Sequence, residues 1–173
     1  MAIREIITLP HNTLRRKARK VTSFGLELQT LIDDMVETMR AAPGVGLAAP
    51  QVNVPLRVIV VEFVEFKENE DEETPPKLHM VVNPEIARSS PDQELGTEGC
   101  LSIPHIVGDV ERSLKVTLKG YNRRGQPIKI KADGWLARIF QHEVDHLDGI
   151  LFVDRAERVW QIEGETTQIA PAD

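Results

Sequence analysis

Residues 133–149 read DGWLARIFQHEVDHLDG, and this stretch decides the fold more than any other part of the chain. Its apolar side chains recur at the three- and four-residue spacing that places them on one face of a helix. Asp133 stands before the pattern as a candidate N-cap, and Gly149 stands where a glycine ends a helix. The sequence therefore predicts a helix over residues 134–147, with an apolar stripe formed by Trp135, Leu136, Ile139 and Phe140.

The stripe continues into the pentapeptide HEVDH at residues 142–146. Side chains four residues apart project from the same helix face, so the imidazoles of His142 and His146 can both reach one metal ion. Glu143, beside the first histidine, is placed to accept a proton from a water molecule on that ion. The alternative is a pair of surface histidines without a ligand, and the position of the motif on an apolar helix favours the metal site.

Two imidazoles do not complete a catalytic site, which usually has three protein ligands and one water. One class of peptidases adds a histidine six residues after the second one, but Phe152 occupies that position and cannot bind a metal. Another class adds a glutamate roughly 20 residues downstream, for which Glu163 and Glu165 are candidates. The remaining candidate is Cys100, whose thiolate a metal would keep deprotonated.

Outward from this helix, the same patterns predict a second helix and several strands. Apolar residues at helical spacing predict a helix over residues 24–41, for which Thr22 and Ser23 are N-cap candidates. Strands are predicted at residues 57–66 and 78–83, and a β-hairpin at 113–120 and 126–131. One helix, then strands, then another helix indicate an α+β fold rather than alternating βαβ units.

The 173 residues suit one domain with a single core. We expect the catalytic domain to occupy residues 1–162 and to be followed by a polar tail over residues 163–173. Residues 67–77, KENEDEETPPK, are acidic and polar, and they have little apolar area to bury. They are therefore predicted to form a mobile surface loop.

Composition and charge exclude several classes of protein. Hydrophobic residues make up 41% and charged residues 28%, the balance of an ordinary globular protein. The net charge of −6 repels polyanions, so no nucleic-acid partner is expected, and the basic residues 15–20 are interpreted as a solvated face. We expect no membrane partner, because no apolar run reaches the roughly 20 residues that span a bilayer. The single cysteine permits no internal disulfide, and the N-terminus does not resemble a secretory signal, which together favour the cytoplasm.

Three segments carry a family resemblance when they are taken together. They are GVGLAAPQ at residues 44–51, EGCLS at residues 98–102 and QHEVDHL at residues 141–147. In this order and at these separations, they resemble the three signature motifs of the peptide deformylases. Each alone is weaker, since the glycine-rich segment by itself is compatible with a simple tight turn. The likeness extends from about Ile3 to about Arg158, and Leu101 is the residue found in active members.

The resemblance implies a fold and a metal site. It implies one domain of mixed or antiparallel β-sheets around a central, C-terminal metal-binding helix, with the N-terminal helix packed alongside. Family members bind one divalent ion through residues that correspond here to Cys100, His142 and His146. Ferrous iron (Fe2+) is the expected ion, and zinc, nickel or cobalt can take its place because one thiolate and two imidazoles suit several metals.

The resemblance also implies an activity. The family removes the N-formyl group from the N-terminal formyl-methionine of nascent polypeptides and releases formate. Metal-bound water is the nucleophile, and the residue corresponding to Glu143 is the general base and acid. The Gln51 side-chain amide and the Leu101 backbone N–H correspond to the groups that stabilise the oxyanion. An N-formylmethionyl nascent peptide is the expected partner.

Substrate-binding residues are carried over in the same way. Val45 and Ile139 correspond to an apolar pocket for the methionine side chain, and the backbone of Gly46 to a segment that pairs with the extended peptide. Arg112 corresponds to an arginine near the substrate. His105 departs from the family pattern, because many relatives have glutamate there. The basic C-terminal helix that docks some bacterial members on the ribosome has no counterpart, so only transient proximity to the ribosome is expected.

Two other functions remain open at this stage. The first is a metallopeptidase that uses Glu163 or Glu165 as its third ligand, which would keep its metal when Cys100 is replaced. The second is a non-catalytic domain that a metal only stabilises. A structural site of that kind usually has four protein ligands, and the sequence offers three.

Overall fold

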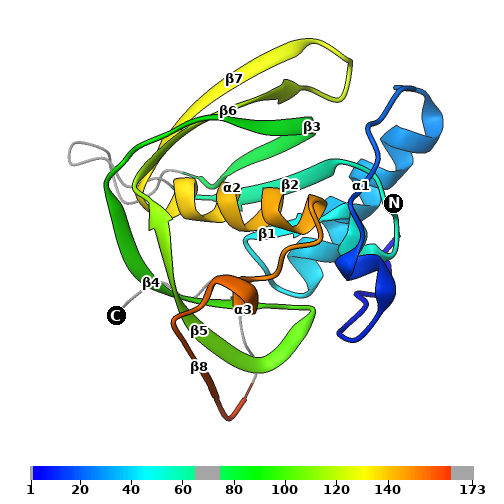
Figure 1. Ribbon diagram of the computed structural model, residues 1–173. Coiled ribbons are helices and arrows are strands. Elements are labelled where there is room, and N and C mark those ends of the chain that lie inside the picture. Colours follow the sequence, from blue (N-terminus) through cyan, green and yellow to red (C-terminus); the bar gives the residue numbers. More distant parts are fainter. Residues whose placement is uncertain (1, 65–74, 165–173) are drawn as a thin grey trace.

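Helix α2 (Gly134–Leu147) lies at the centre of the molecule in the computed structural model (Figure 1). The structure describes residues 2–64 and 75–164, and within these ranges the strands form two antiparallel sheets. The five-stranded sheet has the order β1 (Gly46–Ala48), β2 (Val58–Phe63), β3 (Lys77–Ser89), β6 (Lys115–Tyr121), β7 (Pro127–Asp133). The three-stranded sheet has the order β4 (Gln93–Cys100), β5 (Ile103–Ser113), β8 (Arg158–Gln161).

Strand β2 is buried on both faces, which explains its uninterrupted run of branched apolar residues. Ile59 and Val61 belong to the core that α2 closes, whereas Val58 and Val60 belong to the core beneath α1 (Leu26–Ala41). The alternation follows from the two-residue period of a strand. Each such side chain contributes about 1.5–3 kcal/mol when it leaves water, so β2 fixes both helices against the sheet.

The outer strands β6 and β7 are covered on one face only. Val116 and Leu118 pack toward α2, together with Ala132 of β7. Helix α1 lies over the other end of the sheet (Figure 1), and the alternate residues of β6 and β7 are exposed or half-buried. This part of the sheet therefore has one apolar face and one polar face, as antiparallel sheets often do.

The three-stranded sheet closes the opposite side of α2 and has its own small core. Cys100 at the end of β4 and Val110 of β5 are buried there with Leu151 and Phe152. Phe152 begins the short helix α3 (Phe152–Arg155), which packs on β5. The 3-10 helices η1 (Asn12–Arg15) and η2 (Ala49–Val52) contact each other near α2.

The expected α+β fold, with antiparallel sheets around the C-terminal helix, is confirmed. The bounds of α2 and the β6–β7 hairpin also agree with the sequence patterns. The N-cap prediction for α1 was wrong, because the cap residue is Gly25 and it makes no side-chain bond, whereas Thr22 and Ser23 precede it. Within the described ranges, none of the helices has the length and the apolar composition that a bilayer span requires.

Two sequence predictions fall mainly on residues that lie outside the described ranges. The predicted loop over residues 67–77 is described only from Pro75 onward, and Lys77 already begins β3. The predicted tail over residues 163–173 is described only at Glu163 and Gly164.

Candidate metal centre

Helix α2 presents two histidines one turn apart on its buried side. The ring centroids of His142 and His146 lie 5.1 Å apart, and the two residues are 2% and 1% exposed. The apolar stripe of the same helix packs against the five-stranded sheet and holds the helix in place. The two imidazoles are therefore held with little freedom to move.

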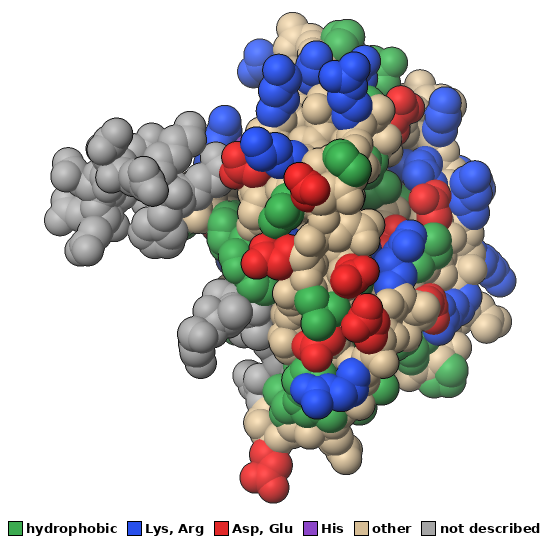
Figure 2. Space-filling view, turned by 60° about the vertical axis from the view of Figure 1, so that its left-hand side comes forward, with side chains coloured by type: hydrophobic (Ala, Val, Ile, Leu, Met, Phe, Trp, Pro, Cys, Tyr) green, Lys and Arg blue, Asp and Glu red, His purple; other side chains and the backbone are tan. Residues whose placement is uncertain are grey.

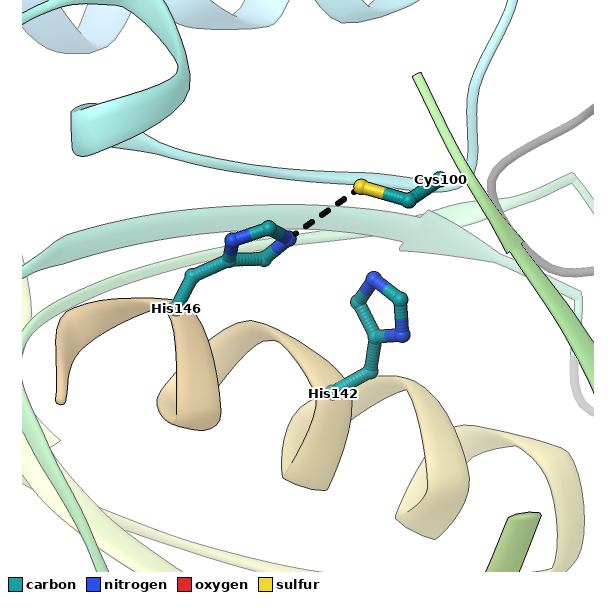
Figure 3. Close-up of side chains that lie close together, drawn as sticks. All are labelled: Cys100, His142 and His146. Atoms are coloured by element: carbon teal, nitrogen blue, oxygen red, sulfur yellow. Dashed lines mark hydrogen bonds between the residues drawn. The ribbon is translucent and has the colours of Figure 1, made fainter. Parts of the chain in front are cut away.

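Cys100 reaches these histidines from the end of β4. The register of the β4–β5 pair shifts between Gly99 and Cys100, and such an irregularity re-aims a side chain. Sγ of Cys100 lies 3.4 Å from Nε2 of His146, and the ligand atoms of Cys100, His142 and His146 all lie within 4.8 Å of one another (Figure 3). In the part of the chain that the structure describes, no other group of histidine, cysteine and carboxylate side chains meets this criterion.

The polar atoms of this site fit a metal ion. Nδ1 of His142 lies 2.8 Å from Oε1 of Glu98, which leaves Nε2 turned toward the other two side chains (Figure 3). Nε2 of His142 is buried and has no hydrogen-bond partner among the described residues. An orphaned buried polar atom costs about 1–3 kcal/mol, and a metal ion would remove that cost. One thiolate and two imidazoles form a ligand set that zinc and other first-row ions accept.

The other positions considered for a third ligand do not join this group. The ring of Phe152 stacks on His142, with centroids 6.2 Å apart and an interplanar angle of 18°, so it packs against that imidazole. Glu163 follows β8 and is absent from the group of possible metal ligands. Glu165 lies outside the described residues.

A buried ionic network surrounds His142. Both carboxylate oxygens of Glu98 accept hydrogen bonds from Arg112 at 2.9 Å, and one of them also accepts a bond from Arg138 at 2.6 Å. Arg112 donates a further bond to Asp145 at 2.6 Å. Glu98 is fully buried and Arg112 is 4% exposed, so these charges are satisfied by one another. The network holds the Glu98 carboxylate in place, and that carboxylate in turn orients the His142 ring.

The network keeps its charges at neutral pH. Burial alone would raise the pKa of Glu98, but the hydrogen bonds from His142 and Arg112 hold that pKa well below its usual value. Burial alone would lower the pKa of Arg112, but Glu98 and Asp145 raise that pKa above its usual value. The carboxylate and the guanidinium therefore remain ionised.

The pKa values of Cys100 and His146 are both shifted in the direction that favours the neutral form. Burial raises the pKa of the Cys100 thiol to about 12, and the negative charges of Glu143 and Glu98 add to this effect. Burial lowers the pKa of His146 well below its usual value, and His142 and Arg112 lower it further. Without a cation, the thiol keeps its proton and His146 is neutral. A bound metal would displace the thiol proton.

Glu143 lies against the first strand of the larger sheet. It is fully buried, and a Cβ built at Gly46 would lie only 2.6 Å from its Oε2. Glycine is thus required at position 46 for the carboxylate to approach β1 this closely. Gly46 opens β1, which is an edge strand of the described sheet.

Gln51 comes to the site from η2. Its Oε1 accepts a hydrogen bond from the backbone N–H of Ala48 at 3.0 Å, which fixes the orientation of the amide. Its Nε2 lies 3.6 Å from Sγ of Cys100 and donates to Oγ of Ser102 at 3.1 Å. The amide N–H group of Gln51 is therefore beside the thiol, in a fully buried side chain.

The remaining predicted site residues differ in their surroundings. Leu101 follows Cys100 directly and packs, half-buried, against the core beneath α1. Val45 is half-buried and Ile139 fully buried in the core of α2. Arg112 lies in the interior, where its three guanidinium nitrogens all bond to carboxylates, so it presents no exposed donor surface to a ligand.

Sequence reasoning gave no role to two residues of the network, Glu98 and Arg138. Glu98 stands in the EGCLS motif, and an acidic residue two positions before a candidate metal ligand was a usable signal. The sequence carried no signal for Arg138, because an arginine on a helix is ordinarily exposed. It crosses β4 at Gly96, where a Cβ would lie 2.7 Å from its Cζ.

The fold and the site define a class of protein. An α+β domain whose central helix carries a His-Glu-X-X-His motif, with a cysteine as third potential ligand, has the arrangement typical of mononuclear metal-dependent hydrolases. Three side-chain ligands would leave a coordination position for water and substrate.

Comparison with known proteins agrees with this class. A family model described as "Polypeptide deformylase" matches residues 3–161. A peptide deformylase from Symbiobacterium thermophilum is 50% identical over 155 residues, which cover 90% of this chain and 67% of the relative. The crystal structure of peptide deformylase from Thermotoga maritima superimposes with a TM-score of 0.81 at 39% identity, covering 91% of this chain and all of that one.

A further solved structure shows a related protein with a peptide. A class I type b peptide deformylase from Acinetobacter baumannii, in its Met-Ala-Ser bound form, has a TM-score of 0.81 at 38% identity and covers 89% of this chain and 98% of that one. The chain belongs to the peptide deformylase family, the metal-dependent hydrolases that remove the N-formyl group from nascent polypeptides.

Proposed function

We propose that Cys100, His142 and His146 hold one divalent ion and that Glu143 is the general base and acid of deformylation. The observation that carries this proposal is the convergence of three buried ligand atoms within 4.8 Å, one of which has no other partner among the described residues. When bound, the ion acts as a Lewis acid that lowers the pKa of a water molecule and polarises a carbonyl oxygen.

Glu143 is suited to move a proton in this site. It is fully buried on the same helix turn as the first histidine, and its carboxylate lies close against β1 at Gly46. It accepts the proton of the attacking water and passes it to the nitrogen atom that leaves with the peptide. The products are formate and a peptide with a free amino terminus.

We assign the developing oxyanion to the Nε2–H group of Gln51 and the backbone N–H of Leu101. Support comes from the fixed orientation of the Gln51 amide and its 3.6 Å separation from Sγ of Cys100. Leu101 is adjacent to that cysteine in the chain. Donors that are in place before the reaction need no reorganisation when charge develops.

The substrate would lie along β1 as an added strand. Gly46 belongs to an edge strand, and main-chain pairing there would hold an extended peptide beside Glu143. We expect Val45 to contact the methionine side chain and Ile139 to support the floor of its pocket from the core. The Met-Ala-Ser peptide in the related Acinetobacter baumannii structure supports a formylated Met-Ala-Ser peptide as the test substrate.

Arg112 is better suited to positioning than to direct substrate contact. Its guanidinium is buried between Glu98 and Asp145, and it reaches His142 only through Glu98. We therefore propose that Arg112 acts through the metal ligand. Ferrous iron remains the proposed ion, the cytoplasm the proposed location, and residues 1–162 the proposed catalytic domain.

One experiment separates the proposed function from its alternatives. The chain is loaded with nickel or iron, and formate release from formyl-Met-Ala-Ser is measured for the wild type, Glu143→Gln and Cys100→Ala. We expect Glu143→Gln to bind metal and to lose at least about 100-fold in kcat/KM, because general acid–base catalysis contributes that much. Cys100→Ala should lose the metal, and Glu111→Gln, at an exposed position of β5, is the matched control that should behave as wild type.

Other outcomes would favour the other functions. Retention of metal by Cys100→Ala, together with cleavage of internal peptide bonds, would indicate a metallopeptidase. Metal-dependent stability in a wild-type protein that releases no formate would indicate a structural site.

A further inference from the structure

Five cationic side chains gather on the solvent face of the five-stranded sheet. They are Arg88 of β3, Lys115 and Lys119 of β6, and Lys129 and Lys131 of β7, all exposed. We call them the basic sheet face. In the described part of the chain, none of the five takes part in an ion pair.

The register of the strands explains how these residues come together. Lys119 is paired directly with Lys129, and Thr117 lies between Arg88 and Lys131 in the ladder. Residues at a two-residue spacing share one face of a strand, so the four lysines of the hairpin all point away from α2. Figure 2 shows lysine and arginine side chains grouped at the top of the molecule, where Figure 1 places β6 and β7.

Folding accounts for only part of this arrangement, through the acids Glu85 and Asp133 that lie opposite Lys119 and Lys115. Like charges directly opposite in a sheet are destabilising, and Lys119 and Lys129 are such a pair. Lysine on an edge strand protects it against aggregation, which explains Lys129 and Lys131 on β7. It does not explain Lys115 and Lys119, because β6 is an inner strand.

The surface around these residues is hollowed. Depressions of about 290 and 440 Å³ lie beside Lys131, and one of about 420 Å³ lies between Lys119 and Lys129. Tyr121, which is 40% exposed, lines the last of these. Two acids also lie on this face, since Glu85 is paired in register with Lys119 and Asp133 with Lys115. The cations therefore outnumber the acids on this face, although the whole chain carries a net charge of −6.

The face lies apart from the metal centre. Helix α2 packs on the opposite side of these strands, and its histidines point toward β4 (Figures 1 and 3). A partner bound to the basic sheet face would thus leave β1 and the catalytic site open.

We propose that the basic sheet face binds the phosphate backbone of RNA. Exposed cations spread over a broad face match a chain of regularly spaced phosphates, and Tyr121 at its end offers a ring on which a base can stack. An acidic protein partner would need buried apolar anchors, and Tyr121 is the one exposed large hydrophobic residue that lines the described hollows of this face. The proposal goes beyond deformylation and replaces the expectation, drawn from net charge alone, that no nucleic acid binds.

The test measures the affinity of the full chain for a 20-nucleotide uridine RNA by fluorescence anisotropy, at two salt concentrations. If all five cations contact phosphates, affinity should fall about 100-fold between 50 and 200 mM salt. Lys119→Gln/Lys129→Gln should weaken binding about tenfold, whereas the matched control Lys17→Gln/Lys20→Gln, of equal charge change at exposed positions elsewhere, should change it less than about threefold. Formate release should be unchanged in both, and neither variant should melt at a lower temperature than wild type, which separates this test from that of the catalytic site.

Three results would overturn the proposal. They are the absence of binding at 50 mM salt, equal weakening by the two double variants, and competition by polyglutamate peptide as strong as by unlabelled RNA. The last result would assign the face to an acidic protein instead.

Discussion

Glu98 is the residue on which the interior of the site depends. Its carboxylate accepts bonds from Arg112 and Arg138 and orients His142, yet it is fully buried. A buried ion pair contributes little net stability, but removing one partner leaves uncompensated charge and costs about 3–5 kcal/mol. Stability and ligand orientation are therefore coupled through one side chain.

Replacing Glu98 with glutamine should reveal this coupling. We expect Glu98→Gln to lower the free energy of unfolding by about 3 kcal/mol, because Arg112 and Arg138 then lack their counter-charge. Metal affinity should fall roughly 10- to 100-fold, because His142 loses its orienting partner. Urea denaturation and competition with a chelator measure the two effects. Glu94→Gln, on the same strand but exposed, is the control and should change neither. If Glu98→Gln were as stable as wild type, the buried arginines would not need the charge of Glu98, and the prediction would be wrong.

At the scale of elements, the end of α2 is held by the N-terminal segment. The carbonyl oxygen of Leu147 accepts hydrogen bonds from the backbone N–H of Ala18 and from Arg57. Gly149 follows with a φ of +73°, and a Cβ there would lie 2.5 Å from the backbone oxygen of Arg15. The last turn of α2, which carries His146, therefore packs against the segment that precedes α1.

Two glycine substitutions separate backbone strain from this close contact. Gly134→Ala, at a φ of +59° with nothing within 4 Å of the added Cβ, should cost about 1–2 kcal/mol from strain alone. Gly149→Ala carries the same strain and must also displace the backbone at Arg15, so we expect at least about 2 kcal/mol more. Chemical denaturation gives both values. Equal losses would mean that the segment around Arg15 moves without cost.

The elements that the sequence predicts are those whose own residues set the pattern. Helix α2 has its stripe and its terminal glycine, and the β6–β7 hairpin alternates around a turn. Strands β4 and β8 are different, because QELGTEGC and RVWQ show no clear alternation and gain their order from pairing with β5. The start of α1 was misplaced because Thr22 and Ser23 are good caps, although the chain turns only at Gly25.

In the candidate site, too, residues that a local pattern predicts differ from residues whose role depends on distant parts of the chain. His142, Glu143 and His146 are local in sequence, and periodicity alone places them on one helix face. Cys100 is separated from His146 by 46 positions in the sequence, although its Sγ lies beside the His146 ring. Its place in the site could therefore be predicted only from the family resemblance or seen in the fold. Arg138 and Arg112 could not be recognised as interior residues, because burial of a charge depends on partners distant in sequence.

At the scale of the whole molecule, both the stability of the fold and the proposed metal binding depend on whether the Cys100 thiol carries its proton. Without metal, the folded chain keeps the Cys100 thiol protonated up to about pH 12, whereas the unfolded thiol has a pKa of 9.0. The folded state then binds more protons than the unfolded state as pH rises through this window, so the stability of the metal-free protein falls there. The contribution of the buried thiol to the stability of the metal-free protein is fully present below pH 9.0.

A metal ion bound by Cys100, as proposed above, would reverse this dependence, because binding would require the thiolate. Below the thiol pKa, each pH unit should strengthen binding about tenfold, which is about 1.4 kcal/mol of additional stabilisation at a fixed free metal concentration. Between pH 7 and pH 8.5, the gain in melting temperature on loading with buffered zinc should therefore grow by about 4–8 °C. Differential scanning calorimetry of loaded and chelator-treated protein at both pH values measures the gain, and Cys100→Ala is the control that should show none. A gain that is the same at both pH values would mean that no proton leaves the thiol, and that the cysteine is not a ligand.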